Sequence, residues 1–370
     1  MALPRGVRSP KPMAAAAASA SPPQPRPGHM LVLGTGFVGR YVSQRLLAQG
    51  WSATYFPCSS ILDRILLLLP PRVSGTCTSP AKKTELEMLG MDASVFDATS
   101  SRCCFFFFFL LFLFFVPSSL TNLRSLQDAT HLLISIPPIP GIGDPLLSSH
   151  SNLQTTLSNS NLQWLCYLSS TSVYGDCGGA WVDEDHTVNP KTESVKLRYA
   201  AEKGWLNVID DLDLSAFVFR LGGIYGPGRS AVDTIAKSKS LSRRQKSRES
   251  KQYTARIHVA DICQAILASM SIRSARRIYN VVDDDPAPRS EVFAFARSLV
   301  ERKHPGLIMD SVVLPATQDR IVAAEKRVSN ARLKEELGVK LLHPTYKSGL
   351  QSILDSWSVE SSFSNRNVDV

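Results

Sequence analysis

The sequence predicts an α/β fold, a doubly wound parallel sheet with a smaller C-terminal lobe. Short apolar runs typical of buried strands alternate with helical patterns along most of the chain, which is the order of a parallel sheet covered by helices. The first apolar run, 30–33, leads into a turn that begins at Gly34 and ends at Gly39, and a helical pattern follows. This succession of strand, glycine turn and helix is the context that a dinucleotide-binding turn requires.

Each glycine of this turn has a physical role. Gly34 permits the tight turn, Gly36 lets a pyrophosphate approach the backbone, and Gly39 lets the helix lie close to the strand. The free N–H groups and the positive end of the helix dipole would then face the phosphates. The alternative, a glycine-rich turn without a ligand, is disfavoured because a strand and a helix stand on either side of it.

The remaining elements follow from apolar periodicity, beginning with a helix at 37–49. Further strands are predicted at 73–78, 93–97, 129–136, 164–169, 214–221 and 278–282, and further helices at 82–89, 191–209, 291–301 and 329–337. The domains that result are a leader at 1–29, a dinucleotide-binding domain at 30–221, a lobe at 222–345 with one returning strand near 278–282, and a tail at 346–370.

The composition is that of a globular protein, since 44% of the 370 residues are hydrophobic and 20% are charged. The net charge of +9 is partly local, because 236–256 holds eight Lys or Arg and only one acid, Glu249. A solvated loop is favoured here over a nucleic-acid surface, because no known motif accompanies the charges. The seven cysteines show no CxxC spacing, so neither a disulfide framework nor a metal site is predicted, and a reducing compartment fits.

The N-terminal leader is rich in Ala, Pro, Ser and Arg, and the first acidic residue of the chain is Asp63. An acid-free leader of this composition resembles an organellar transit peptide, which favours a chloroplast location. The alternatives are a disordered tail, or a start at Met13 and a cytoplasmic protein.

Five stretches carry a resemblance to a known family. They are LVLGTGFVG at 31–39, YLSSTSVYGD at 167–176, FRLGGIYGPGR at 219–229, ARIHVADI at 255–262 and IYNVVDDDPAPRSEV at 278–292. In this order they resemble the extended or atypical short-chain dehydrogenase/reductases, the NAD-dependent epimerase/dehydratase group, and most of all an epimerase-like branch of plastids and bacteria.

The resemblance implies a Rossmann fold, with the cofactor at the C-terminal ends of the strands and the substrate beneath the lobe. It implies an NAD(P)-dependent oxidoreductase or epimerase-like enzyme that acts on a nucleotide sugar or another small hydroxyl or carbonyl substrate. A homodimer is compatible with it. The alternative is a cofactor-binding sensor or scaffold without turnover.

The family's chemistry uses a Ser or Thr after the fifth strand and a Tyr-x-x-x-Lys pair on the next helix. The tyrosine acts as general acid/base, and the lysine lowers its pKa and holds the ribose. The match places the hydroxyl at Ser170, with Thr171 beside it. The alternative role for Ser170 is to cap backbone groups at the strand end.

Two registers compete for the Tyr/Lys pair. Tyr199 and Lys203 have the required spacing. The family, however, places a glutamate four residues after the lysine, and matching it to Glu202 puts Arg198 at the lysine position and Ser194 at the tyrosine position. Five residues rotate a helix by about 140°, so the two registers cannot serve one cleft. The second register is favoured, and it lacks the usual tyrosine.

Other residues are placed in the site by the resemblance. Tyr174 is a spare phenol, although a packing role is favoured for it, and His258 is predicted to be structural. Arg229 could hold a phosphate or carboxylate, or form a surface salt bridge. The loop that closes on cofactor and substrate would contain Arg220, Gly222, Tyr225 and Arg229, and the cofactor would also contact Phe37, Val38, Asp97, Ile136 and Pro137.

NADP is the expected cofactor, with NAD as the alternative. No acid follows the predicted strand 73–78, where an acid would hold the ribose 2′-OH of NAD. Thr78, Ser79, Lys82 and Lys83 stand there instead, and hydroxyl and ammonium groups suit a 2′-phosphate.

Two segments, 54–72 and 100–117, interrupt sequence that resembles the family on both sides. The second contains an apolar run of 14 residues, 103–116, which is shorter than the 18 or more of a membrane helix, so no membrane span is expected. Five consecutive Phe residues would be hard to pack in a core. The favoured interpretation is retained intron sequence, and the alternative is a real insertion or membrane hairpin. The full chain is therefore expected to fold less well than one without them.

Overall fold

The structure is a computed structural model. It describes residues 28–51, 72–96, 124–149, 153–210, 212, 214–237, 253–272, 277–307 and 325–357. Residues 1–27 of the predicted leader, 54–71 of the first suspected segment and the whole segment 100–117 lie outside these ranges, so the expectations about them stay predictions. The predicted bounds extend too far at His29 and Arg72, which both belong to strands.

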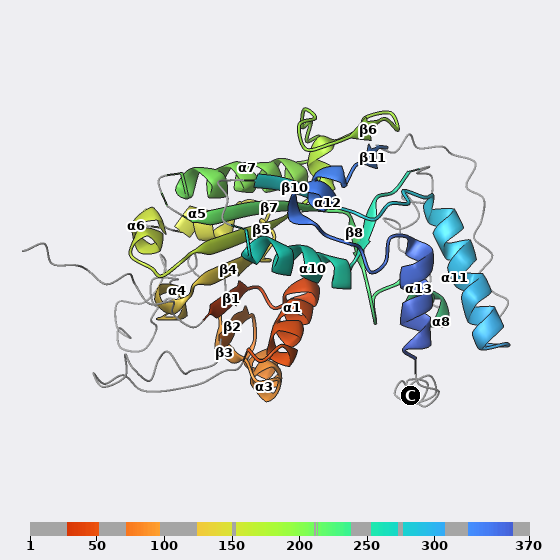
Figure 1. Ribbon diagram of the computed structural model, residues 1–370, viewed down its shortest axis with the longest axis horizontal. Coiled ribbons are helices and arrows are strands. Elements are labelled where there is room, and N and C mark those ends of the chain that lie inside the picture. Colours follow the sequence, from red (N-terminus) through yellow and green to blue (C-terminus); the bar gives the residue numbers. More distant parts are fainter. Residues whose placement is uncertain are drawn as a thin grey trace, which may run out of the picture.

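A sheet of seven strands forms the centre of the molecule, and every neighbouring pair runs parallel (Figure 1). Its order, β10-β7-β5-β4-β1-β2-β3, is that of a doubly wound sheet, which confirms the predicted fold class. The strands are β1 (His29–Leu33), β2 (Arg72–Cys77), β3 (Asp92–Val95), β4 (His131–Ile134), β5 (Trp164–Ser170), β7 (Ser215–Leu221) and β10 (Arg277–Val281).

Helices cover both faces of this sheet, which explains why the strands read as continuous apolar runs. Successive residues of β1 pack on opposite faces of the sheet: Val32 belongs to one core and Leu33 to the other. The first core includes α1 (Phe37–Ala48), α3 (Pro80–Met88), α10 (Val259–Met270) and α12 (Ala331–Leu337), and the second α4 (Arg124–Asp128), α5 (Pro145–Ser149), α6 (Leu153–Ser158) and α7 (Glu193–Val208). The sequence prediction missed α10 and the short helices α4, α5 and α6.

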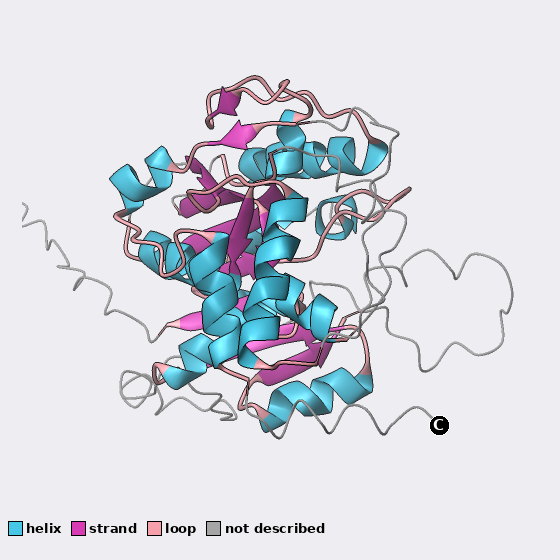
Figure 2. Cartoon of the chain, turned by 90° about the vertical axis from the view of Figure 1, so that its right-hand side faces the viewer, coloured by secondary structure: helices cyan, strands magenta, loops and turns pink. Residues whose placement is uncertain are grey.

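The lobe has a core of its own, formed by α8 (Ala231–Ala236), α11 (Arg289–Lys303) and α13 (Tyr346–Asp355). Figure 2 views the molecule from the side on which this lobe lies. The prediction of a tail at 346–370 is wrong for residues 346–355, which form α13. Tyr346, Leu350 and Ile353 of this helix are buried in the lobe core. Their spacing of four and three residues is that of one helical face.

Two short parallel pairs lie outside the main sheet. β8 (Gly223–Tyr225) pairs with β9 (Arg256–His258), and β6 (Trp181–Val182) pairs with β11 (Arg327–Val328). Within the described ranges, no helix has the length and apolar character needed to cross a membrane.

Candidate functional site

A cavity of about 1100 Å³ lies between the C-terminal ends of the sheet strands and the lobe. This is where open α/β sheets bind ligands. From the dinucleotide-binding domain it is lined by Val38, Ser135, Pro137, residues 168–172, Arg198, Leu221 and Gly222, and from the lobe side by residues that include Tyr225, Arg229, Lys237, Tyr253, Arg256, Arg289 and Lys326.

The glycine turn is built as a dinucleotide site requires. Gly34 has a φ of +93°, and its N–H donates to the hydroxyl of Thr76 at 2.9 Å, which ties the turn to the neighbouring strand. A Cβ on Gly39 would collide with the carbonyl oxygen of Gly34, so only glycine lets α1 lie this close. A Cβ on Gly36 would meet no atom within 4 Å.

These features fit a nicotinamide dinucleotide. The space beside Gly36 adjoins the first turn of α1, whose N-cap makes no side-chain hydrogen bond, so its N–H groups are available to phosphate oxygens. Val38 lines the cavity, and Phe37 lies under the guanidinium of Arg229, 5.2 Å from ring centre to Cζ. The turn and the cavity therefore belong to one continuous site.

At the end of β2, Thr78 is exposed and Ser79 caps α3 by accepting the N–H of Lys82 at 3.4 Å. The nearest acid along α3, Glu85, forms an ion pair with Arg40 at 2.5 Å. Of the other residues expected at the cofactor, Pro137 lines the cavity, Ile136 packs against the second core, and Asp97 lies outside the described residues.

Three predicted residues meet at the end of β5. Ser170 lines the cavity and accepts the N–H of Ser172 at 3.2 Å. The hydroxyl of Thr171 donates to the carbonyl of Leu221 at 3.4 Å. Arg198 of α7 reaches the same place, and its Nη1 donates to the carbonyl of Leu168 at 3.3 Å. The structure thus joins Ser170, Thr171 and Arg198 on one wall of the cavity.

The ordinary Tyr/Lys register does not reach this wall. Tyr199 packs against a separate cluster that contains Val173 and Val182, and the exposed Lys203 lies over its ring at 4.8 Å. Ser194 is exposed at the start of α7, with Thr192 3.3 Å away. None of Tyr199, Lys203 and Ser194 is among the described residues that line the cavity.

Arg220 is buried in a polar network, which corrects its expected place in the substrate loop, and Tyr174 packs in the same network, as favoured from the sequence. Arg220 forms a buried ion pair with Glu202 at 2.9 Å and donates to the hydroxyl of Tyr174 at 3.0 Å. That hydroxyl donates to Asn280 at 2.8 Å, and the hydroxyl of Ser169 donates to Glu202. Burial raises the pKa of Tyr174, although Arg220 opposes this, which favours the neutral phenol.

The loop after β7 contributes in different ways. A Cβ on Gly222 would lie 2.9 Å from the backbone of Arg256, so glycine permits this close crossing of strands. Tyr225 is buried and lines the cavity, whereas Arg229 is exposed at its edge. His258 is structural, as predicted from the sequence, because its ring caps α10 by accepting the N–H of Ala260.

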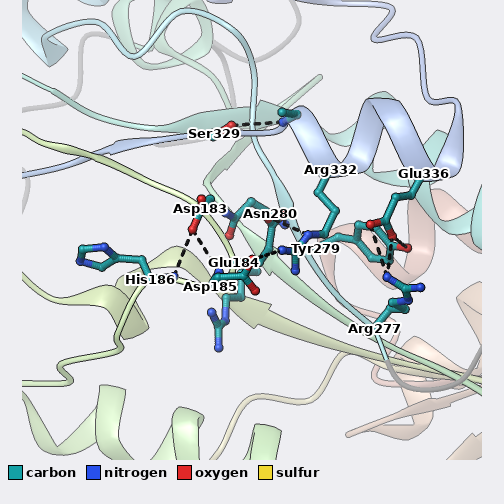
Figure 3. A network of polar contacts seen from close by, with 12 residues as sticks. Asp183, Glu184, Asp185, His186, Arg277, Tyr279, Asn280, Ser329, Arg332 and Glu336 are labelled. Atoms are coloured by element: carbon teal, nitrogen blue, oxygen red, sulfur yellow. Dashed lines mark hydrogen bonds and ion pairs between the residues drawn. The ribbon is translucent and has the colours of Figure 1, made fainter.

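Behind the cavity, a polar network holds the 183–186 loop and α12 against the edge strand β10 (Figure 3). The carboxylate of Glu184 accepts the N–H of Asn280 at 2.6 Å, and Arg332 lies 3.8 Å from it. Glu336 accepts the hydroxyl of Tyr279 at 2.8 Å and pairs with Arg277 at 3.2 Å. These contacts join elements far apart in sequence and are structural.

No protein-family model matches the sequence, and no curated protein matches it. Solved structures do. A conserved protein of unknown function from Silicibacter pomeroyi is 30% identical, with 89% of this chain and 98% of that chain covered and a TM-score of 0.63. A candidate NAD-dependent epimerase/dehydratase from Methylobacillus flagellatus is 23% identical over 89% and 98% of the two chains, with a TM-score of 0.56. The chain belongs to the same family as the Silicibacter pomeroyi protein. It shares the Rossmann fold of NAD-dependent epimerases and dehydratases.

A more distant member of the fold is UDP-glucuronic acid 4-epimerase from Bacillus cereus, solved as a tyrosine-to-phenylalanine mutant with NAD and a fluorinated UDP-sugar. It is 15% identical over 88% of this chain and 98% of that chain, with a TM-score of 0.58. At this identity the likeness concerns the fold alone.

Arg198→Ala is expected to weaken cofactor binding about tenfold, because one charge-assisted hydrogen-bonding group leaves the cavity wall. Tyr199→Phe is expected to change neither binding nor any activity, because Tyr199 packs outside the cavity. Titration of both variants with NADP checks this. A large loss of rate in Tyr199→Phe, with unchanged cofactor binding, would show that Tyr199 and Lys203 are the Tyr/Lys pair after all.

The sequence did not predict the basic side chains that line the lobe side of the cavity, above all Arg256 and Arg289. The signal available was the basic run at 236–256, which was assigned to a solvated loop. Residues 238–252 lie outside the described ranges, but the flanking Lys237 and Tyr253 both line the cavity.

Proposed function

We propose that the protein is an NAD(P)-dependent oxidoreductase or epimerase-like enzyme that acts on a hydroxyl or carbonyl carbon of a small substrate, such as a nucleotide sugar. One observation carries the proposal. A single cavity runs from Val38 beside the glycine turn, past Ser170 and Arg198, into the lobe. Cofactor and substrate could therefore lie in contact. The UDP-sugar bound by the Bacillus cereus epimerase supports the substrate class.

In this proposal the glycine turn and the N–H groups of α1 bind the pyrophosphate. Arg198 donates to ribose hydroxyls, and Ser170 donates a hydrogen bond to the substrate oxygen, while Thr171 beside it bonds the carbonyl of Leu221. The nicotinamide supplies or accepts a hydride when bound. Because Ser194 stands where the family has its tyrosine, the hydroxyl of Ser170 would have to polarise the substrate oxygen in place of a phenol.

The competing proposal is a cofactor-binding sensor or scaffold without turnover. The exposed Ser194 favours it, since no phenol from α7 reaches the cavity wall within the described residues. The two proposals predict the same cofactor binding and differ only in turnover.

Turnover over a panel of substrates separates the two. The panel contains UDP-glucuronic acid, UDP-glucose and simple aldehydes and ketones, with nicotinamide absorbance and product chromatography as readouts. We expect an epimerised, oxidised or reduced product from at least one compound. Tight cofactor binding with no product from any of them would favour the sensor.

NADP is expected to bind about tenfold or more tightly than NAD, because a 2′-phosphate gains a charge-assisted hydrogen bond at the start of α3. Lys82→Ala should reduce this preference. Lys83→Ala is the matched control, since Lys83 pairs with Glu87 at 3.6 Å. Calorimetry with both cofactors measures the ratio, and equal or reversed affinities in the wild-type protein would contradict the assignment.

A further inference from the structure

A half-buried thiol lies against an imidazole in the stretch 175–186, and neither group is among the described residues that line the cavity. Sγ of Cys177 lies 3.8 Å from Nε2 of His186, which is within hydrogen-bond reach for sulfur. The His186 ring is exposed and points away from the polar network around Glu184 (Figure 3). The carbonyl oxygen of Tyr174 also lies 3.8 Å from the sulfur, but a carbonyl cannot take up a proton. An imidazole can, so the pair is a thiol with its own base.

The other three cysteines of the described residues are buried. Burial raises the pKa of Cys263 to about 11 and raises that of Cys166 well above its ordinary value, so both stay neutral thiols. Sγ of Cys77 donates to the carbonyl of Ser94 at 3.6 Å. Buried cysteines are inert, because reaction needs both the thiolate and access to solvent. Cys177 differs from these three buried thiols because it reaches solvent beside a base.

The surroundings of Cys177 suit a second molecule. A Cβ on Gly178, the next residue, would meet no atom within 4 Å, so this side of the thiol is open. Lys326 and Arg327 each donate to a backbone carbonyl of the same loop at 2.8 Å. The adjoining acid, Asp176, already accepts two backbone N–H groups. Cations near a cysteine favour the thiolate, which is the form that attacks disulfides.

The backbone of Cys177 is also joined to the chain that leads into β11. The N–H groups of Cys177 and Gly179 both donate to the carbonyl of Glu325, at 2.9 and 3.2 Å. Glu325 directly precedes Lys326, which lines the cavity. A group attached to the sulfur would add bulk at this junction. A change at the thiol therefore acts on the rim of the cavity.

We propose that Cys177 is a modification site that forms a mixed disulfide with a low-molecular-weight disulfide, with His186 as the base. Nε2 of His186 takes the thiol proton, and Sγ of Cys177 attacks one sulfur of the small disulfide. The S–S bond of that disulfide breaks as the new one forms, and the departing sulfur takes the proton from His186. The products are the mixed disulfide and one small thiol. The adduct loosens the contact with Glu325, and an excess of small thiol reverses the step. This site is independent of the reaction proposed above.

The full chain is treated with oxidised glutathione, and peptide mass spectrometry follows each cysteine separately. Cys177 should react at least about tenfold faster than the three buried thiols. His186→Asn should slow this reaction about tenfold or more, because asparagine bonds the sulfur but takes no proton. Thr187→Ala is the matched control, since Thr187 is exposed and adjoins His186, and it should leave the rate unchanged.

Two further readouts separate the role of the base from a change in structure. At about pH 10 an ordinary thiol is ionised without a base, so the wild-type protein and His186→Asn should react at similar rates. A variant that unfolds would show itself by fast reaction of the three buried thiols. Both readouts use the same peptides as the rate measurement.

Amide hydrogen exchange measures the effect on the loop. The N–H groups of Cys177 and Gly179 should exchange about tenfold or more faster in the glutathione adduct, and reduction should restore their protection. Any one of three results would overturn the proposal: Cys177 reacts no faster than the buried thiols, His186→Asn reacts as fast as the wild-type protein at neutral pH, or the adduct leaves the exchange of these two amides unchanged.

Discussion

Gly36→Val is expected to lose at least about 100-fold in affinity for both NADP and NAD, because two or more charge-assisted hydrogen bonds from the turn to the pyrophosphate would be blocked. The fold should survive, since a Cβ at this position meets no protein atom within 4 Å and the backbone there is extended, with φ −73°. The branched side chain would instead fill the space that the phosphates need. Titration calorimetry and thermal unfolding of the variant measure the two effects separately.

The same substitution at Gly39 should lower the stability of the fold, whereas Gly36→Val should lower the affinity for cofactor. A Cβ on Gly39 would collide with the carbonyl oxygen of Gly34, so Gly39→Val should push α1 away from β1 and lower the unfolding temperature. If Gly36→Val binds cofactor as tightly as the wild-type protein, the dinucleotide assignment of this turn is wrong. If Gly36→Val lowers the unfolding temperature as much as Gly39→Val does, the space beside Gly36 is not open.

Glu202→Gln is expected to destabilise the protein by about 3–5 kcal/mol, because removing one partner of a buried ion pair leaves an uncompensated charge. The side chains of Arg220 and Glu202 are 3% and 1% exposed, so water cannot replace the lost partner. The change also weakens the bond from Ser169 at the end of β5, next to Ser170. Chemical denaturation measures the free energy of unfolding.

Two further variants test whether the cost comes from the unpaired charge. Glu202→Leu combined with Arg220→Met removes both charges and should recover much of the stability lost by Glu202→Gln. Arg277→Gln breaks a pair in which Arg277 is 50% exposed, and it should cost less than about 1 kcal/mol. A cost for Glu202→Gln as small as that for Arg277→Gln would refute the importance of the buried pair.

Local signals in the sequence were sufficient for the fold class and for the cofactor turn. The spacing of Gly34, Gly36 and Gly39 acts within one strand-turn-helix unit, and the apolar runs mark strands that helices cover on both faces. The helix α13 could also have been predicted, because Tyr346, Leu350 and Ile353 have helical spacing. Its position near the end of the chain led to its assignment as a tail.

The tertiary structure decided which residues share the cavity wall with Ser170. A helix presents different residues on different sides, so only the packing of α7 against β5 determines that Arg198, and not Tyr199, lies at the cavity. Glu202 lies on α7 and Arg220 lies near the end of β7, and they meet because α7 covers the end of β5. Sequence by itself determined which residue types were available to the site; long-range packing determined which of them share a cavity and which are buried as structural partners.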